Sequence, residues 1–272
     1  MQVPTAGGRT AAAGARACDP RHSWNSLPFG SKASHLDTDL HSGSRSQQVT
    51  FLLEACLSVS YGDPRQWTLP RRLQGLLAIA LAGGDSSLTL LARCTNLQCG
   101  KPMDLDLDLG RFVTDLPDER FDWSPDGRAT VSLRLPNTVD QERWRDRGLT
   151  GDAEALRAMA ASLVVVIDGK APAPGFLVPE AWMDTLTDAF EIRDPLTSLE
   201  LEADCPECGE RNRIPLNLEH LLLDHLRDRQ RRLREEVHCL ASAYHWSEAA
   251  IVELPPWRRA IYVARVRQET GR

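Results

Sequence analysis

The 272-residue chain has no long hydrophobic run. Its best candidate, residues 76–82, ends at Gly83-Gly84, whereas a membrane-spanning helix needs about 20 apolar residues. The first 45 residues also lack the continuous apolar stretch of a signal peptide. We therefore expect no membrane partner and no secretion.

The chain also has no recognisable catalytic motif. It contains no GxSxG nucleophile elbow, Walker loop, dinucleotide fingerprint, kinase signature or HExxH helix. Asp104, Asp106 and Asp108 alternate with leucines, which predicts the solvated face of a strand. The histidines of the C-terminal region lack metal-helix spacing; they are His220, His225, His238 and His245. We expect a protein that is not an enzyme.

An excess of positive charge is absent as well, since the formal net charge is −6. Residues 51–210 carry 15 basic and 27 acidic side chains, and residues 211–272 carry 12 and 8. The acidic charge of residues 51–210 argues against nucleic-acid binding by this part of the chain. An arginine-rich segment over residues 227–234 leaves one rival interpretation, a zinc-ribbon nucleic-acid-binding or transcription-associated protein, in which these arginines contact phosphate.

Two short cysteine pairs are the most informative feature that is present. Cys94/Cys99 and Cys205/Cys208 each lie between alternating apolar and polar residues, and each pair is followed by a glycine, a pattern typical of strand, metal-binding turn, strand. Such a turn offers two thiolates to one metal ion, and two turns complete a tetrahedral zinc site. The sequence therefore predicts a structural zinc site that is split by 105 intervening residues.

Three other interpretations of these cysteines remain open. They are two separate disulfides, a thioredoxin-like redox motif at Cys205/Cys208, and thiols that bind no metal. The absence of a signal peptide and the odd total of seven cysteines weigh against disulfides, and strand-like sequence after Cys208 weighs against a redox motif. Cys18, Cys56 and Cys239 are not expected to be ligands.

The rest of the sequence predicts an α+β protein with four regions. Residues 1–45 are a low-complexity leader that we expect to be disordered, and residues 46–86 contain helices over 47–61 and 70–81. Residues 87–216 form split zinc-ribbon-like β knuckles with an inserted α+β, largely helical subdomain over about 128–195, which includes a strand at 130–136 and a helix at 152–166. Residues 217–272 form a long helix and a C-terminal helical hairpin.

Aromatic and arginine side chains concentrate in that hairpin. Both residue types are favoured at protein interfaces because they give large contact area at a low entropic cost. The alternative is that the rings only form the small core of the hairpin. The candidate partner-binding residues are Tyr244, Trp246, Trp257, Arg258, Arg259 and Tyr262.

Residues 236–262, with the Cys205-Pro206-Glu207-Cys208-Gly209 knuckle and the strand that ends in Leu135-Pro136, resemble baseplate proteins of contractile phage tails and phage-tail-like injection systems. The resemblance covers about residues 65–267 and is most specific in the C-terminal signature. The four-residue gap between Cys94 and Cys99 and the long leader depart from the family pattern.

The resemblance implies a non-enzymatic component related to the baseplate hub assembly (chaperone) proteins of T-even-type phages. Its partners would be other baseplate, hub or spike proteins, and Cys94, Cys99, Cys205 and Cys208 would hold the zinc. The protein would act in the cytoplasm of a bacterial or phage-infected cell, either as an assembly chaperone or as a subunit incorporated in the particle.

Overall fold

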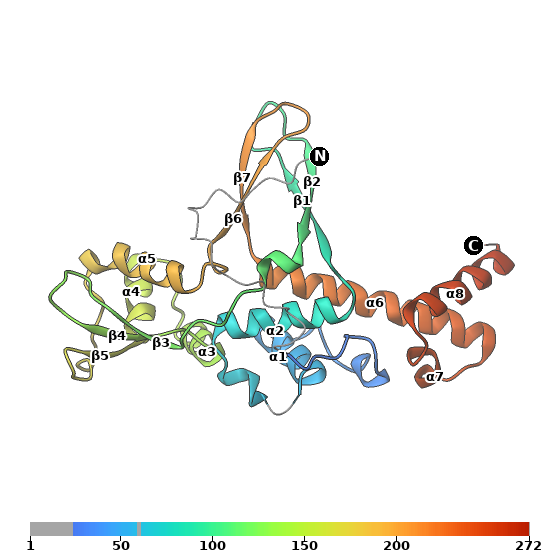
Figure 1. The fold of residues 1–272 in the computed structure, drawn as a ribbon, viewed down its shortest axis with the longest axis horizontal. Helices are drawn as coiled ribbons and strands as arrows, with labels where there is room; N and C mark the ends of the chain where they lie inside the picture. Colours follow the sequence, from blue (N-terminus) through green and yellow to red (C-terminus); the bar gives the residue numbers. More distant parts are fainter. Residues whose placement is uncertain (1–23, 59–60, 272) are drawn as a thin grey trace.

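The structure is a computed structural model that describes residues 24–58 and 61–271. These residues form both helices and antiparallel strands, which confirms the α+β class. A helical layer lies at the centre, two β hairpins rise from it, and a small subdomain and a helical hairpin lie at opposite ends (Figure 1). No helix within the described ranges is long and apolar enough to cross a bilayer.

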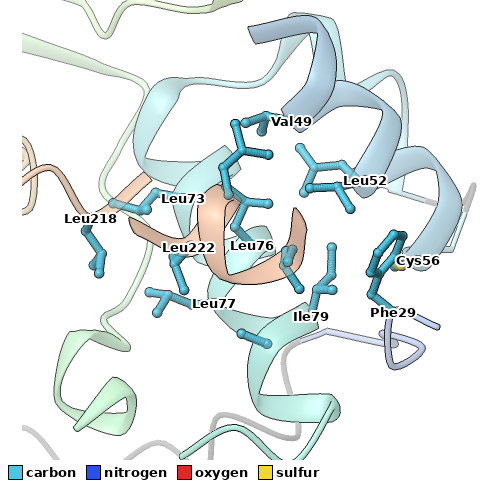
Figure 2. Packing of buried hydrophobic residues seen from close by; sticks show 14 of the residues in the cluster. Phe29, Val49, Leu52, Cys56, Leu73, Leu76, Leu77, Ile79, Leu218 and Leu222 are labelled. Carbon is cyan, nitrogen blue, oxygen red and sulfur yellow. The ribbon is translucent and has the colours of Figure 1, made fainter. Parts of the chain in front are cut away.

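The main core is formed by helices α1 (Arg45–Cys56), α2 (Leu69–Ala82) and the first turns of α6 (Leu218–Tyr244). Ser44 and Gln47 form a capping box that fixes the start of α1, and Pro70 lies in the first turn of α2, where its missing N–H costs nothing. Leucines from the three helices interdigitate (Figure 2); the fully buried ones include Leu52, Leu53, Leu76, Leu77 and Leu222.

Part of the predicted disordered leader belongs to this core. Phe29 and Leu40 have exposed fractions of 1% and 0%, and the short 3-10 helix η2 (Ala33–His35) lies between them. The expectation of disorder is therefore wrong for residues 24–45, because a few large apolar side chains fill gaps that the helices leave open. Residues 1–23 of the leader lie outside the described residues.

The first two helices differ in how well the sequence predicted them. The helix expected over 70–81 is confirmed by α2. The helix expected over 47–61 is too long, because α1 ends at Cys56 and Leu57 turns into an extended conformation that bridges to Ser26. The bridge supplies backbone pairing that a further helical turn would not.

The inserted subdomain contains a three-stranded antiparallel sheet in the order β3-β4-β5, formed by β3 (Arg120–Trp123), β4 (Val131–Arg134) and β5 (Val164–Ile167). Helices α3 (Thr138–Asp146), α4 (Ala153–Ala161) and α5 (Met183–Arg193) accompany it. The helix expected over 152–166 is wrong at its end, where the run of three valines and an isoleucine forms β5, as β-branched residues favour. The sheet also begins before the predicted boundary at 128.

Helix α6 is 27 residues long and connects two cores. Its first half packs on α1 and α2, and its second half packs on α7 (Glu248–Val252) and α8 (Pro256–Thr270), so the C-terminal region contains the predicted long helix and helical hairpin. Asp85, just after α2, forms an ion pair with Arg229 of α6 at 2.8 Å, and its carboxylate lies 2.9 Å from His225 Nε2 of the same helix. These contacts tie the end of α2 to the long helix.

A buried arginine joins α2 to α1. The Arg72 side chain is 1% exposed, and its guanidinium donates to the backbone oxygens of Ser46 and Pro64 at 2.7 and 2.8 Å and to Thr50 Oγ1 at 3.1 Å. Burial lowers the pKa of Arg72 to about 10, so the group stays charged at neutral pH. Neutral oxygens thus satisfy a charge in the middle of the fold.

Replacement of Arg72 by Met should lower the free energy of unfolding by about 2–4 kcal/mol, because the buried oxygens lose their donors. Arg72→Lys should recover only part of this loss, since an ammonium cannot reproduce the planar fork. Urea denaturation followed by circular dichroism measures both values. The control is Arg45→Met at an exposed position of α1, and equal losses at 72 and 45 would contradict the assigned role.

Candidate metal centre

Two β hairpins carry the four predicted ligands. Strands β1 (Ser87–Arg93) and β2 (Pro102–Asp108) form the first, and β6 (Leu199–Asp204) and β7 (Arg211–Leu216) form the second. The hairpins form separate two-stranded sheets, yet their tips meet above the helical layer (Figure 1). The junction is therefore made by side chains.

Each cysteine pair occupies a tight turn at the tip of its hairpin. Cys94 N donates to Lys101 O at 2.9 Å and Cys99 N to Asn96 O at 2.9 Å, and in the second turn Cys205 N donates to Glu210 O at 2.8 Å. Gly100 and Gly209 have φ values of +55° and +74°, a conformation that glycine adopts without a steric penalty. The glycine after each pair thus lets the chain reverse behind the sulfurs.

The sulfurs of the two turns lie close together. Cys94 Sγ is 3.6 Å from Cys208 Sγ, and Cys99 Sγ is 3.8 Å from Cys205 Sγ; all four ligand atoms lie within 4.8 Å of one another. A tetrahedral metal with bonds of about 2.3 Å to sulfur requires sulfur atoms about 3.8 Å apart. The four cysteines therefore fit a single tetrahedral metal ion.

The same geometry bears on the other interpretations of these cysteines. All four thiols are free, and the two sulfur–sulfur separations between the turns, 3.6 and 3.8 Å, also exceed the roughly 2.05 Å of a disulfide bond. Cys205 and Cys208 lie between two strands rather than at the start of a helix, unlike a thioredoxin-type motif. One shared site accounts for the position of both pairs.

The electrostatics of the cluster differ from sulfur to sulfur. The backbone N–H groups of Cys208 and Glu207 lower the pKa of Cys205 to about 7, and burial raises the pKa of Cys94. At Cys208 the Glu210 N–H lowers the pKa, but burial and the three neighbouring sulfurs outweigh it and raise the pKa to about 12. The lowered pKa of Cys205 favours its thiolate form, whereas the raised pKa values of Cys94 and Cys208 mean that a bound cation would be needed to favour the thiolate there.

A buried amide links the two turns. Asn212 on β7 is 0% exposed; its Oδ1 accepts from Thr95 N at 2.6 Å and from Thr95 Oγ1 at 2.9 Å. Its Nδ2 donates to the backbone oxygens of Glu210 and Ala203 at 2.7 and 3.3 Å. Asn212 therefore holds the residue after Cys94 against the second knuckle and fixes the distance between the ligand pairs.

Sequence reasoning missed Asn212, although a signal was present. Asn212 shares a strand face with Ile214 and Leu216, which makes it a polar residue at an inward position of an otherwise apolar face. Apart from the ligands, the small core between the hairpins consists of Met103, Ala92 and Ile214. With so few apolar contacts, the sulfurs and Asn212 carry most of the junction.

The predicted partner-binding residues lie in the C-terminal hairpin, away from the cysteines (Figure 1). Tyr244 stacks on Trp246 with ring centroids 4.9 Å apart, and Tyr262 contacts both rings. Arg258 lies 5.6 Å from the Tyr262 ring. The rings form a small aromatic core that leaves Trp246 38% exposed.

Two of these residues have opposite environments. Trp257 is 67% exposed, whereas Arg259 is only 7% exposed. Arg259 donates to Glu236 at 2.8 Å and to the backbone oxygens of Leu254 and Val252 at 2.6 and 3.2 Å. The expectation that Arg259 contacts a partner conflicts with this burial, because its donors close the turn between α7 and α8.

The other polar candidates remain outside the centre. Asp104, Asp106 and Asp108 are exposed on β2, as the alternation predicted. His225 pairs with Asp85, and His220 pairs with Asp224 at 3.3 Å. Within the described ranges, the four cysteines form the only cluster of three or more side chains of metal-ligand type.

The purified protein should bind one tetrahedral metal ion per chain through four thiols, with the release of protons. Elemental analysis and thiol titration before and after chelation measure both numbers, and cobalt(II) should give the absorption of a tetrahedral thiolate site. Cys208→Ser should abolish the cobalt spectrum, while Cys56→Ser on α1 should leave it intact. Four reactive thiols before chelation, with no bound metal, would refute the site.

Asn212→Ala should weaken metal binding about 10- to 100-fold, because the two ligand pairs lose the group that positions them. Competition with a chromophoric chelator measures the affinity. Gln98→Ala, at an exposed position in the first turn, should bind like the wild type. If the two variants bind the metal equally well, Asn212 does not position the ligands.

Comparison of the chain with protein-family models, with curated proteins and with solved structures finds no match.

Proposed function

We propose that this protein is a non-enzymatic assembly factor or structural subunit. A structural zinc ion rigidifies the pair of β hairpins, β1–β2 and β6–β7, and the C-terminal helical hairpin contacts partner proteins. The observation that carries the proposal is the closed set of four sulfurs at the hairpin tips. Four protein ligands leave no coordination position for water or substrate, which is the mark of structural rather than catalytic zinc.

Zinc is the metal that the ligand chemistry favours. Zinc accepts four thiolates in a tetrahedron without a redox change, and structural zinc contributes about 10 kcal/mol or more to folding in small domains. Each two-stranded hairpin would be at best marginally stable alone. The ion would therefore supply the stability that the few apolar contacts between the hairpins do not.

The resemblance of residues 236–262 and the Cys205 knuckle to baseplate proteins suggests which partners these are. On that basis we propose other baseplate, hub or spike subunits of a contractile tail or tail-like injection system. The exposed Trp257 and Ile261 of α8, at 67% and 55%, support a contact role for the hairpin, because large apolar groups at that exposure gain most from being covered.

The nucleic-acid alternative is less favoured because four of the five arginines over residues 227–234 are already engaged. Arg229 pairs with Asp85 and Arg231 with Asp228, while Arg227 pairs with Asp224 and donates to Leu40 O at 2.8 Å. Arg234 donates to Leu36 O at 2.9 Å. An arginine that holds the fold together is not free to neutralise phosphate.

Trp257→Ala should reduce copurification with the baseplate subunits of the same particle by at least about tenfold, since loss of a large anchor at an interface costs 1.4 kcal/mol or more. Coexpression and affinity purification, followed by quantitative mass spectrometry, measure the loss. Leu91→Ala, at a similarly exposed apolar position on β1 with an exposed fraction of 74%, is the control. Unchanged copurification of the Trp257 variant, with metal content and fold preserved, would reject the hairpin as the contact surface.

A further inference from the structure

Helix α8 has one apolar face that the fold covers and a second that it does not. Val263 and Val266 pack into the core with α6. Trp257 and Ile261 lie one helical turn apart on the opposite side and are 67% and 55% exposed, and Ala264 continues their line. The outer face of α8 is thus a short apolar stripe without a partner among the described residues.

Positive charge flanks this stripe on both sides. At about 100° per residue, Arg265 falls on one side of the line from Trp257 to Ile261 and Arg267 falls on the other. Both arginines are exposed, and neither forms an ion pair with any described residue. The stripe is therefore complementary to a surface that has an exposed apolar side chain next to carboxylates, which would pair with the two arginines.

Helix α5 in the inserted subdomain offers that chemistry. Leu186 is buried in the core of the subdomain, and the outer face presents Asp184, Asp188 and Glu191 at exposed positions. Ile192, next to them, is 78% exposed. Within the described part of the chain, the carboxylates of Asp184, Asp188 and Glu191 form no hydrogen bond and no ion pair.

A second acidic surface, on β2, is a poorer match. Asp106 already accepts a hydrogen bond from Thr89 at 2.8 Å, and Asp108 accepts one from Gly110 N at 2.9 Å and lies 3.7 Å from Arg111. Two of its three carboxylates would have to give up partners in order to bind arginine. The α5 carboxylates would not.

We propose that α8 of one molecule docks against α5 of a second copy of this chain. The inference rests on the proposed function insofar as the hairpin is a contact surface, and it adds the identity of one partner. Helices α5 and α8 lie at opposite ends of the molecule (Figure 1), so one chain cannot satisfy both of its own faces. The contact joins unlike surfaces, and repetition of it builds a ring or an open chain of copies.

The charges make this association salt-dependent. At about 0.01 M salt the screening length is about 30 Å, and at about 1 M it is about 3 Å. Sedimentation velocity of the metal-loaded full-length protein should show oligomers that grow with concentration at low salt. The sedimentation coefficient should fall to that of a monomer at high salt.

Complementary variants test the pairing itself. Arg265→Glu with Arg267→Glu removes the α8 surface, and Asp188→Asn with Glu191→Gln removes the charge of the α5 surface without making it complementary to the altered α8. Each double variant should be monomeric at low salt, with self-association weakened at least about tenfold. An equimolar mixture should form a dimer and nothing larger, because each member retains only one of the two surfaces.

The control has the same change in charge at positions that the proposal does not use. Arg128→Glu with Arg147→Glu, both exposed, should assemble like the wild type, and circular dichroism should show that every variant is folded. A monomeric wild type at low salt overturns the proposal, as does a mixture that stays monomeric. So does binding of the wild type to phosphatidylglycerol vesicles that is lost in the α8 variant, if no self-association accompanies it.

These outcomes are separable from those of the proposed function. A monomeric chain that still copurifies with baseplate subunits through Trp257 rejects self-docking alone. A chain that assembles with itself but copurifies with no baseplate subunit rejects the baseplate assignment alone.

Discussion

The cluster of four sulfurs is the constraint on which the relative position of the two β hairpins, β1–β2 and β6–β7, depends. The two hairpins form separate sheets, and few apolar side chains lie between them. A two-stranded hairpin is marginal in water by itself. The tips of the hairpins therefore need a direct connection to keep their mutual position, and the tips are where Cys94, Cys99, Cys205 and Cys208 converge.

The separation of these ligands in sequence follows from the fold rather than opposing it. The inserted subdomain has its own sheet and its own buried cluster, so the segment between Cys99 and Cys205 is not a loose loop when the site closes. Even for a flexible loop, doubling the length adds only about 0.6 kcal/mol to the entropic cost of closure. An insertion of this size is thus compatible with a metal contribution of about 10 kcal/mol.

The sequence was most informative where chemistry is local. Cysteines at short spacing beside a glycine predict a metal-binding turn because the ligands and the turn lie within a few residues, and the structure brings those four sulfurs together. Asn212 escaped prediction because its partner, Thr95, is 117 positions away in the sequence. The leader was misjudged for the same reason: Phe29 and Leu40 are sparse in sequence, but they fill spaces created by helices far along the chain.

The wrongly predicted end of the helix expected over 152–166 and the wrongly predicted role of Arg259 have a different origin. The helical pattern of α4 ran on into three valines and an isoleucine because those residues are apolar in either structure, and only their pairing with β4 decides for a strand. Arg259 is a comparable case, since arginine in an aromatic hairpin is typical of an interface. Its side chain instead meets three acceptors of its own chain, a fact that no local pattern encodes.

The cluster of four cysteines and the C-terminal hairpin are connected through α6. Strand β7 ends at Leu216 and α6 begins at Leu218, with Asn217 between them as the N-cap that accepts from His220 N at 2.9 Å. No flexible linker separates the second knuckle from the long helix, and the same helix packs against α8 at its other end. A shift of the two β hairpins would therefore be transmitted to the start of α6, where Leu218 and Leu222 are anchored in the main core. Closure of the sulfur cluster thus fixes the two β hairpins relative to α6, the helix that packs against α8 and its proposed contact surface.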